Sequence, residues 1–140
     1  MNRKRLGVVI VTLALASCSS IPILSGLFID DAQMNQMGVD AFEEIKQKET
    51  IETNAYYNNY VKCVAKNILA VTQDPTGVKE WEIVVFRNNA VNAFALPGGK
   101  IGVYTGLLSV AKNQDQLAAV IGHEVGHVIK QHSKARYQTA

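Results

Sequence analysis

The sequence from about residue 114 onwards predicts one long helix that carries every histidine of the chain. Asn113 is a favourable N-cap, and Gln116, three residues later, completes an Asn-x-x-Gln capping box. Asp115 stands in the first turn, where a negative charge interacts favourably with the helix dipole. We expect the helix to begin near Gln114 and to continue beyond His132. A continuous helix would hold the histidines at fixed angles to one another.

Five residues within that helix, His123-Glu124-Val125-Gly126-His127, match H-E-x-x-H, a zinc-binding pattern of metallopeptidases. At about 100° per residue, His127 lies within about 40° of His123, one turn further along, so both imidazoles can bind one metal. Glu124 is rotated off that shared face, where its carboxylate can take a proton from an attacking water and return it to the leaving amine. The alternative is an ordinary amphipathic helix whose histidines only form hydrogen bonds.

Three further residues of the helix need an explanation. Gly122 and Gly126 each cost about 1 kcal/mol of helix propensity relative to Ala, which predicts a close approach of another element or room around a site. His132 lies about 140° round the helix from His127, on the apolar side of Leu117 and Val125. We therefore expect a structural or indirect role for His132 rather than metal binding. A catalytic zinc takes three protein ligands, and no third ligand stands in a recognisable pattern.

The region before this helix predicts a mixture of helices and strands. Apolar residues recur at helical intervals over two segments, and β-branched and aromatic runs separated by Gly, Pro and Asn predict three short strands. The fold class is therefore α+β. The expected helices are 31–48, 54–71 and a short one at 105–111, and the expected strands are 81–86, 91–96 and 100–104.

The first 17 residues are typical of a lipoprotein signal peptide. A basic start is followed by an apolar run too short to span a bilayer, and small residues precede Cys18. We expect cleavage before Cys18, lipidation of Cys18, and a tether over 18–30. The alternative is an ordinary signal peptide or a buried helix that happens to end in Cys. Ser19, which is not aspartate, is typical of sorting to the outer membrane in lipoproteins of this kind.

Charge and cysteine content limit the possible partners and bonds. The chain has 14 basic and 12 acidic residues, and without the three basic residues of the signal the balance is 11 − 12 = −1. A nucleic-acid-binding protein would keep a basic surplus, so no nucleic-acid partner is expected. If Cys18 is lipidated, Cys63 has no cysteine left to pair with in this sequence. We expect Cys63 to be a buried small apolar residue, or else to pair with a partner outside the sequence.

Three segments together closely resemble the HtpX/LoiP/BepA-type zinc metallopeptidases, gluzincins related to the CAAX prenyl proteases. They are NAFALPGG at 92–99, IGVYTGLL at 101–108 and QLAAVIGHEVGH at 116–127. The resemblance is dense from Trp81 to Ser133 and looser over 31–72. With the lipoprotein signal, the most similar group is the LoiP-type periplasmic lipoproteins.

The resemblance implies a zincin-like fold with N-terminal helices, a small sheet with an edge strand, and a long zinc-binding helix. His123 and His127 would bind one zinc ion, and Glu124 would be the catalytic base. Asn92, Ala93 and Phe94 would form a substrate-binding edge strand. In this family the third ligand is a Glu in an E-x-x-x-D setting on a later helix. We therefore expect 31–140 to be the N-terminal part of the metallopeptidase domain.

The function implied is a zinc metalloendopeptidase acting on misfolded or misassembled envelope proteins. Its location would be the periplasmic face of the outer membrane of a Gram-negative bacterium, where the lipid anchor contacts the membrane. One alternative is a non-catalytic lipoprotein that binds envelope proteins through its strand edge and lacks a complete zinc site. A second alternative is a two-histidine metal-storage module.

Overall fold

The structure, a computed structural model, describes residues 30–139, with side chains described as far as Lys130. The expected signal peptide, the tether over 18–29, Cys18 and the side chain of His132 lie outside this part. The α+β prediction is confirmed. The elements in chain order are α1 (Asp31–Lys48), α2 (Ala55–Val71), β1 (Glu82–Phe86), β2 (Ala93–Leu96), β3 (Lys100–Tyr104), α3 (Thr105–Val110) and α4 (Gln114–Thr139).

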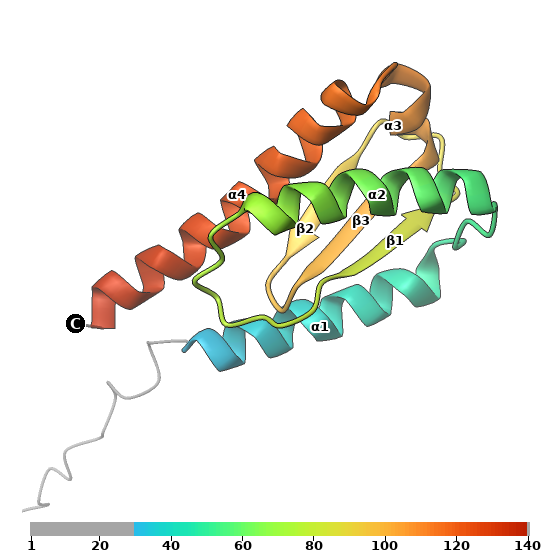
Figure 1. Ribbon diagram of the computed structural model, residues 1–140. Helices are drawn as coiled ribbons and strands as arrows, with labels where there is room; N and C mark the ends of the chain where they lie inside the picture. Colours follow the sequence, from blue (N-terminus) through green and yellow to red (C-terminus); the bar gives the residue numbers. More distant parts are fainter. Residues whose placement is uncertain (1–29, 140) are drawn as a thin grey trace, which may run out of the picture.

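The three strands form one mixed sheet with β3 in the centre (Figure 1). β1 runs parallel to β3, with Ile83 opposite Ile101, and β2 runs antiparallel to β3, with Phe94 opposite Gly102. A tight turn at 97–99 joins β2 to β3. Gly98 and Gly99 in this turn have φ angles of 79° and 71°, a region that glycine adopts without steric cost.

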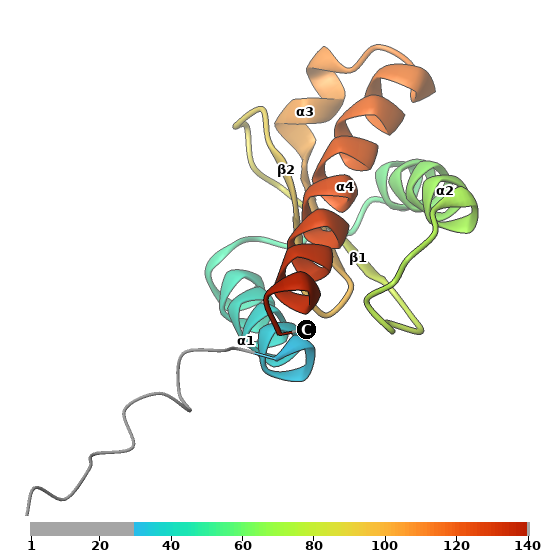
Figure 2. The ribbon, with the colours of Figure 1, turned by 90° about the vertical axis from the view of Figure 1, so that its left-hand side faces the viewer.

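Alternate residues of the strands face two different helical layers, as the period of two in a strand requires. Ile101 and Val103 of β3 face α2 and α4, which pack side by side over β1 and β2 respectively. Gly102 and Tyr104 face the other side, which α1 covers (Figure 2). The main core lies in the first layer. Its fully buried members are Val61, Ala65, Val85, Ile101, Val103, Leu117, Ile121 and Val125.

Under α1, four aromatic rings form a second packed cluster. The rings of Phe42, Phe86, Phe94 and Tyr104 contact one another with centroid separations of 6.0–6.2 Å. The Phe94 ring lies over Gly102, where an added Cβ would collide with it. Phe42 is fully buried, so this cluster fixes α1 to the sheet.

The outer edge of β1 is covered by the segment that precedes α2. The Arg87 amide donates to the Thr50 carbonyl at 2.7 Å, and the Glu52 amide donates to the Val85 carbonyl at 2.8 Å. Covering an edge in this way protects it from pairing with other chains. Among the described residues, the outer edge of β2 has no such pairing.

Two local expectations need correction. The Gln116 backbone amide donates to the Asn113 side chain at 3.0 Å, as the predicted capping box requires. The Gln116 side-chain oxygen accepts from the Lys112 amide at 2.7 Å instead of from the Asn113 amide, so only half of the predicted box forms. Cys63 is exposed rather than buried. The core face of α2 is formed by Val61, Val64 and Ala65, and Cys63 falls on the solvent side because of the helical repeat.

Candidate metal-binding site on helix α4

The two histidines of the H-E-x-x-H pattern meet on the surface of α4. The imidazole rings of His123 and His127 are perpendicular, with centroids 4.3 Å apart, and their Nε2 atoms are separated by 2.8 Å. Both side chains are exposed. The spacing of four residues brings them onto successive turns of one face, as the sequence predicts.

Glu124 lies between this exposed face and the core. Its side chain is half-buried, whereas Ile121, three residues before it, and Val125, the next residue, are fully buried. The rotation of about 100° from His123 places Glu124 nearer the sheet than the two imidazoles. Its carboxylate is therefore adjacent to the histidine pair without being part of it.

The position of Gly122 shows which flank of α4 carries the site. A Cβ on Gly122 would lie 4.0 Å from Cγ2 of Ile68 in α2, so Gly122 faces α2. By the helical repeat, Glu124 and His127 lie on the opposite flank. Because α2 covers β1 and α4 covers β2, that flank is the one beside the open edge of the sheet.

The register of β2 determines which of its backbone groups face that open edge. The Tyr104 amide donates to the Asn92 carbonyl at 3.0 Å, so residues 92, 94 and 96 are the ones that bond to β3. The N–H and C=O groups of Ala93 and Ala95 must then point away from β3. These outward groups are the ones that could pair with an extended peptide.

Of the three predicted substrate-binding residues, Ala93 and Phe94 lie in β2, and Asn92 lies one residue before it. The Ala93 side chain is buried in the core shared with α4. The Phe94 side chain packs on the opposite face, against Phe42. Only the backbone of this segment faces the edge, and Ala95, which was not predicted, provides the second outward pair of groups. The strand alternation was the signal that could have identified it.

The donor set fits part of a zinc site. Tetrahedral zinc with Zn–N bonds of about 2.0–2.1 Å places two imidazole nitrogens roughly 3.3 Å apart, so the observed pair would need to separate by only about 0.5 Å. Within the described residues, no group of three or more His, Cys, Asp or Glu side chains is arranged to hold a metal. The pair would supply two of the zinc ligands, and a third would have to come from outside the described side chains.

Gly126 lies in the middle of the pattern and leaves space. A Cβ placed on Gly126 would have no described atom within 4 Å. Gly122, by contrast, is in ordinary van der Waals distance of α2. Of the two predicted explanations for these glycines, room around the site fits Gly126.

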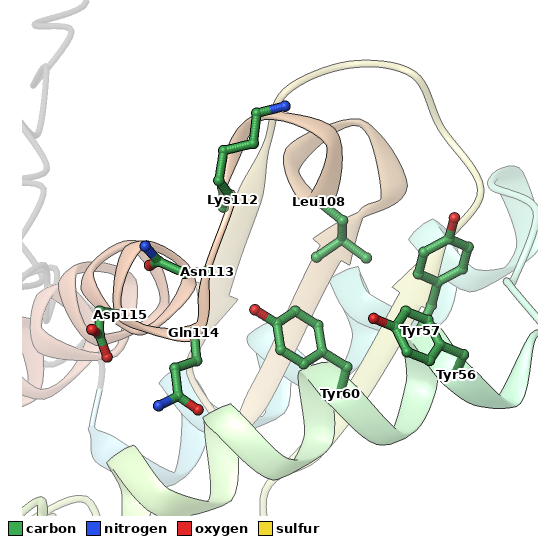
Figure 3. Close-up of a pocket in the computed structure, with 9 residues that line it drawn as sticks. Tyr56, Tyr57, Tyr60, Leu108, Lys112, Asn113, Gln114 and Asp115 are labelled. Atoms are coloured by element: carbon green, nitrogen blue, oxygen red, sulfur yellow. The ribbon is translucent and has the colours of Figure 1, made fainter.

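A cavity of about 550 Å³ opens elsewhere, between the start of α2 and the junction of α3 with α4 (Figure 3). Its aromatic side is formed by Tyr56, Tyr57 and Tyr60, with the rings of Tyr56 and Tyr60 stacked 6.4 Å apart. Residues 111–115 form its polar side. None of the H-E-x-x-H residues lines it, so it is separate from the candidate metal site.

A helix bearing H-E-x-x-H beside an open strand edge is the arrangement expected of a metal-dependent peptidase. Residues 54–139 match the family model for peptidase family M48. The chain belongs to this family. Membership implies a metal cofactor, and the matched segment includes the three strands and the helix with both histidines.

Similarity to two of three individual proteins extends over most of the chain. It is 35% identical over 121 residues to the mitochondrial metalloendopeptidase OMA1 of Schizosaccharomyces pombe, covering 81% of this chain and 35% of that protein. It is 35% identical over 115 residues to metalloprotease LoiP of Escherichia coli, covering 80% of this chain and 43% of LoiP. The OMA1 protein of Arabidopsis thaliana is 49% identical over 63 residues, which is 45% of this chain and 13% of that protein. The chain thus spans less than half the length of these relatives.

Proposed function

We propose that the protein is a zinc-dependent metalloendopeptidase in which His123 and His127 bind the metal. The observation that carries this proposal is the pair of Nε2 atoms 2.8 Å apart on the flank of α4 beside the open edge of β2. The metalloendopeptidase and metalloprotease names of the similar proteins support it. One zinc ion would require a third ligand from outside the described side chains.

A bound zinc would polarise the scissile carbonyl and lower the pKa of a water molecule. Glu124 provides the proton transfer. Its carboxylate accepts a proton from the attacking water and then donates that proton to the leaving amine. The half-buried position of Glu124 beside the two imidazoles suits a base that lies close to the metal without binding it.

The substrate is a protein or peptide held in an extended conformation. The segment Asn92, Ala93 and Phe94, continued by Ala95, binds it through the backbone groups that face away from β3. Backbone pairing gives affinity with little dependence on side chains. That property suits a protease acting on misfolded or misassembled envelope proteins of varied sequence.

The envelope location rests on the first 18 residues of the sequence. None of the helices in the described part of the chain is both long enough and apolar enough to cross a membrane. We attribute membrane association to lipidation of Cys18, with the domain on the periplasmic face of the outer membrane. Two or more acyl chains on one cysteine would give stable attachment.

Cleavage of casein by the purified full-length protein tests this function. Glu124→Gln should lower the rate by at least about 100-fold, because a proton-transfer group typically contributes 10²–10⁴. Glu44→Gln is the matched control, since it changes an exposed glutamate on α1 that forms an ion pair with Lys48 one turn further along the same helix. Equal cleavage by wild type and Glu124→Gln would contradict the mechanism.

The same measurement distinguishes the main alternative. A non-catalytic lipoprotein that binds envelope proteins through the β2 edge would bind casein in both forms and cleave it in neither. The open edge of β2 is the observation that favours this second candidate.

A further inference from the structure

Helix α1 precedes the segment that matches the family model, and it covers the face of the sheet opposite to α4 (Figure 2). It has no residue in the candidate metal site. It nevertheless contacts β2 and β3 and the turn that joins them. That turn, Pro97–Gly99, ends the strand that the proposed function assigns to substrate.

The first half of α1 interlocks with this turn. The Gly98 amide donates to the side-chain oxygen Oδ1 of Asn35 at 2.9 Å. A Cβ on Gly38 would collide with the Pro97 carbonyl group, so glycine alone allows helix and turn to approach this closely. From the other side, a Cβ on Gly98 would lie 2.6 Å from the Asn35 carbonyl oxygen and 2.9 Å from Cγ2 of Val39.

The second half of α1 is fixed independently to the other two strands. Lys46 Nζ lies 2.8 Å from Glu82 Oε1 of β1, and Lys100 Nζ of β3 lies 2.7 Å from Glu82 Oε2. Burial alone would raise the pKa of Glu82, but the hydrogen bonds from Lys100 and Lys46 outweigh it and lower the pKa, so the Glu82 carboxylate stays charged near neutral pH. With Phe42 buried between these contacts, α1 forms a fixed support.

β2 itself has few restraints. It has four residues, and among the described residues it pairs with β3 on one side while no strand pairs with its outer edge. Its first half is held by Ala93 in the core shared with α4. Its second half, which includes the outward groups of Ala95, leads directly into the turn that α1 holds.

We propose that Asn35 and Gly38 are positioning residues for substrate. They hold the turn at 97–99 against α1 and thereby fix the outward backbone groups of β2 relative to His123 and Glu124. This inference rests on the proposed function, because it assigns the β2 edge to substrate binding. Of the contacts between α1 and the turn, the hydrogen bond from the Gly98 amide to Asn35 is the easiest to test. A substitution of Asn35 can remove it without adding side-chain volume.

The test measures kcat and KM for cleavage of fluorescein-labelled casein by the full-length protein carrying Asn35→Ala. Loss of one hydrogen bond that orients the binding strand should raise KM by about threefold to tenfold, with kcat changed by less than about twofold. Asn35→Asp keeps an acceptor oxygen for Gly98 and should restore KM. Gln36→Ala is the matched control, because Gln36 is exposed on the same helix and its side chain donates to Asp40 within that helix.

A purely structural role would lower the thermal midpoint and kcat together, and that result would overturn the inference. An unchanged KM in Asn35→Ala would overturn it as well. Fluorescence anisotropy of the labelled casein on Glu124→Gln, with and without Asn35→Ala, gives a second measurement that needs no catalysis. If the wild-type protein does not cleave casein, the proposed enzymatic function is wrong. Weaker binding of casein by Glu124→Gln with Asn35→Ala than by Glu124→Gln alone would still support the positioning role.

Discussion

Glu52 fixes the segment that covers the outer edge of β1. Its carboxylate accepts from Nε and Nη2 of Arg87, both at 3.1 Å, and from the Asn54 amide at 2.8 Å. The hydrogen bonds from Arg87 are the largest cause that lowers the pKa of Glu52, which falls from 4.5 to about 2. The backbone hydrogen bond from Asn54 acts in the same direction.

This shift predicts an acid-dependent loss of stability. Because the folded-state pKa is the lower one, the stabilisation is complete above about pH 4.5 and is lost as the pH falls towards 2. Glu52→Gln should therefore show a smaller fall in thermal midpoint between pH 5 and pH 2.5, roughly the range between the two pKa values. The control is Glu44→Gln, which removes the carboxylate of an exposed ion pair on α1. An identical acid dependence of the thermal midpoint in wild type and Glu52→Gln would show that Glu52 does not cause the acid-dependent loss of stability.

For individual residues, the sequence was sufficient to predict the relative positions of side chains that belong to one helix. His123 and His127 face one another because the helix repeat alone places them so, and Glu124 follows from the same repeat. The outward role of Ala95 depends on its register with β3, and the hydrogen bond from Asn35 joins residues 63 positions apart. Neither could be derived from spacing along the chain.

Among the elements, β2 is the one whose backbone the proposed function uses directly. Ala95→Pro would remove one outward N–H and leave the hydrogen bonds between β2 and β3, and proline is tolerated on edge strands. We expect KM for casein to rise by about threefold to tenfold, the effect of one lost hydrogen bond, while the thermal midpoint stays near that of wild type.

Ala95→Ser is the control for this change, because it keeps the N–H and adds one atom. A proline variant with wild-type KM would show that substrate does not pair with this edge. A serine variant as impaired as the proline variant would point to the side chain instead.

Two glycines give opposite predictions for the elements that contain them. Gly102→Ala in β3 would push its Cβ into the Phe94 ring, which is confined by Phe42 and Tyr104, and should destabilise the fold by about 1–3 kcal/mol. Gly126→Ala in α4 meets no described atom and should stabilise the helix by up to about 1 kcal/mol. Urea unfolding of both variants measures the difference, and equal effects would contradict the packing of the aromatic cluster.

The sequence predicted the bounds of the helices closely because apolar residues recur at a period that only a helix satisfies. It also predicted three strands, but strand order and direction depend on contacts between distant segments. The parallel pairing of β1 with β3 is one such feature. The exposed position of Cys63 shows a related limit, since a single small residue carries no periodic signal of its own.

For the whole molecule, the two edges of the sheet have opposite environments. Residues 50–52 cover β1, whereas β2 is open beside the flank of α4 that carries the histidines. The support for β2 comes from α1, which lies on the far side of the sheet. The described part of the molecule therefore combines a protected edge, a supported open edge and a helix that carries the candidate metal ligands.

The proposed lipid anchor makes a prediction for the whole molecule. Cys18→Ala in the full-length protein should remove acylation and shift the protein from the membrane fraction to the soluble fraction, because the proposed attachment depends on acyl chains carried by Cys18. Cell fractionation with immunoblotting measures this. Retention of Cys18→Ala in the membrane fraction would contradict lipidation as the cause of attachment, and Cys63→Ala is the matched control.

The most direct test of the central claim is the zinc content of the purified full-length protein, measured by inductively coupled plasma mass spectrometry. We predict about one zinc per chain in wild type and in Glu124→Gln, since Glu124 is assigned to proton transfer. His123→Ala and His127→Ala should each reduce zinc to a small fraction of that value. A full complement of zinc in both histidine variants would contradict the assignment of His123 and His127 as its ligands.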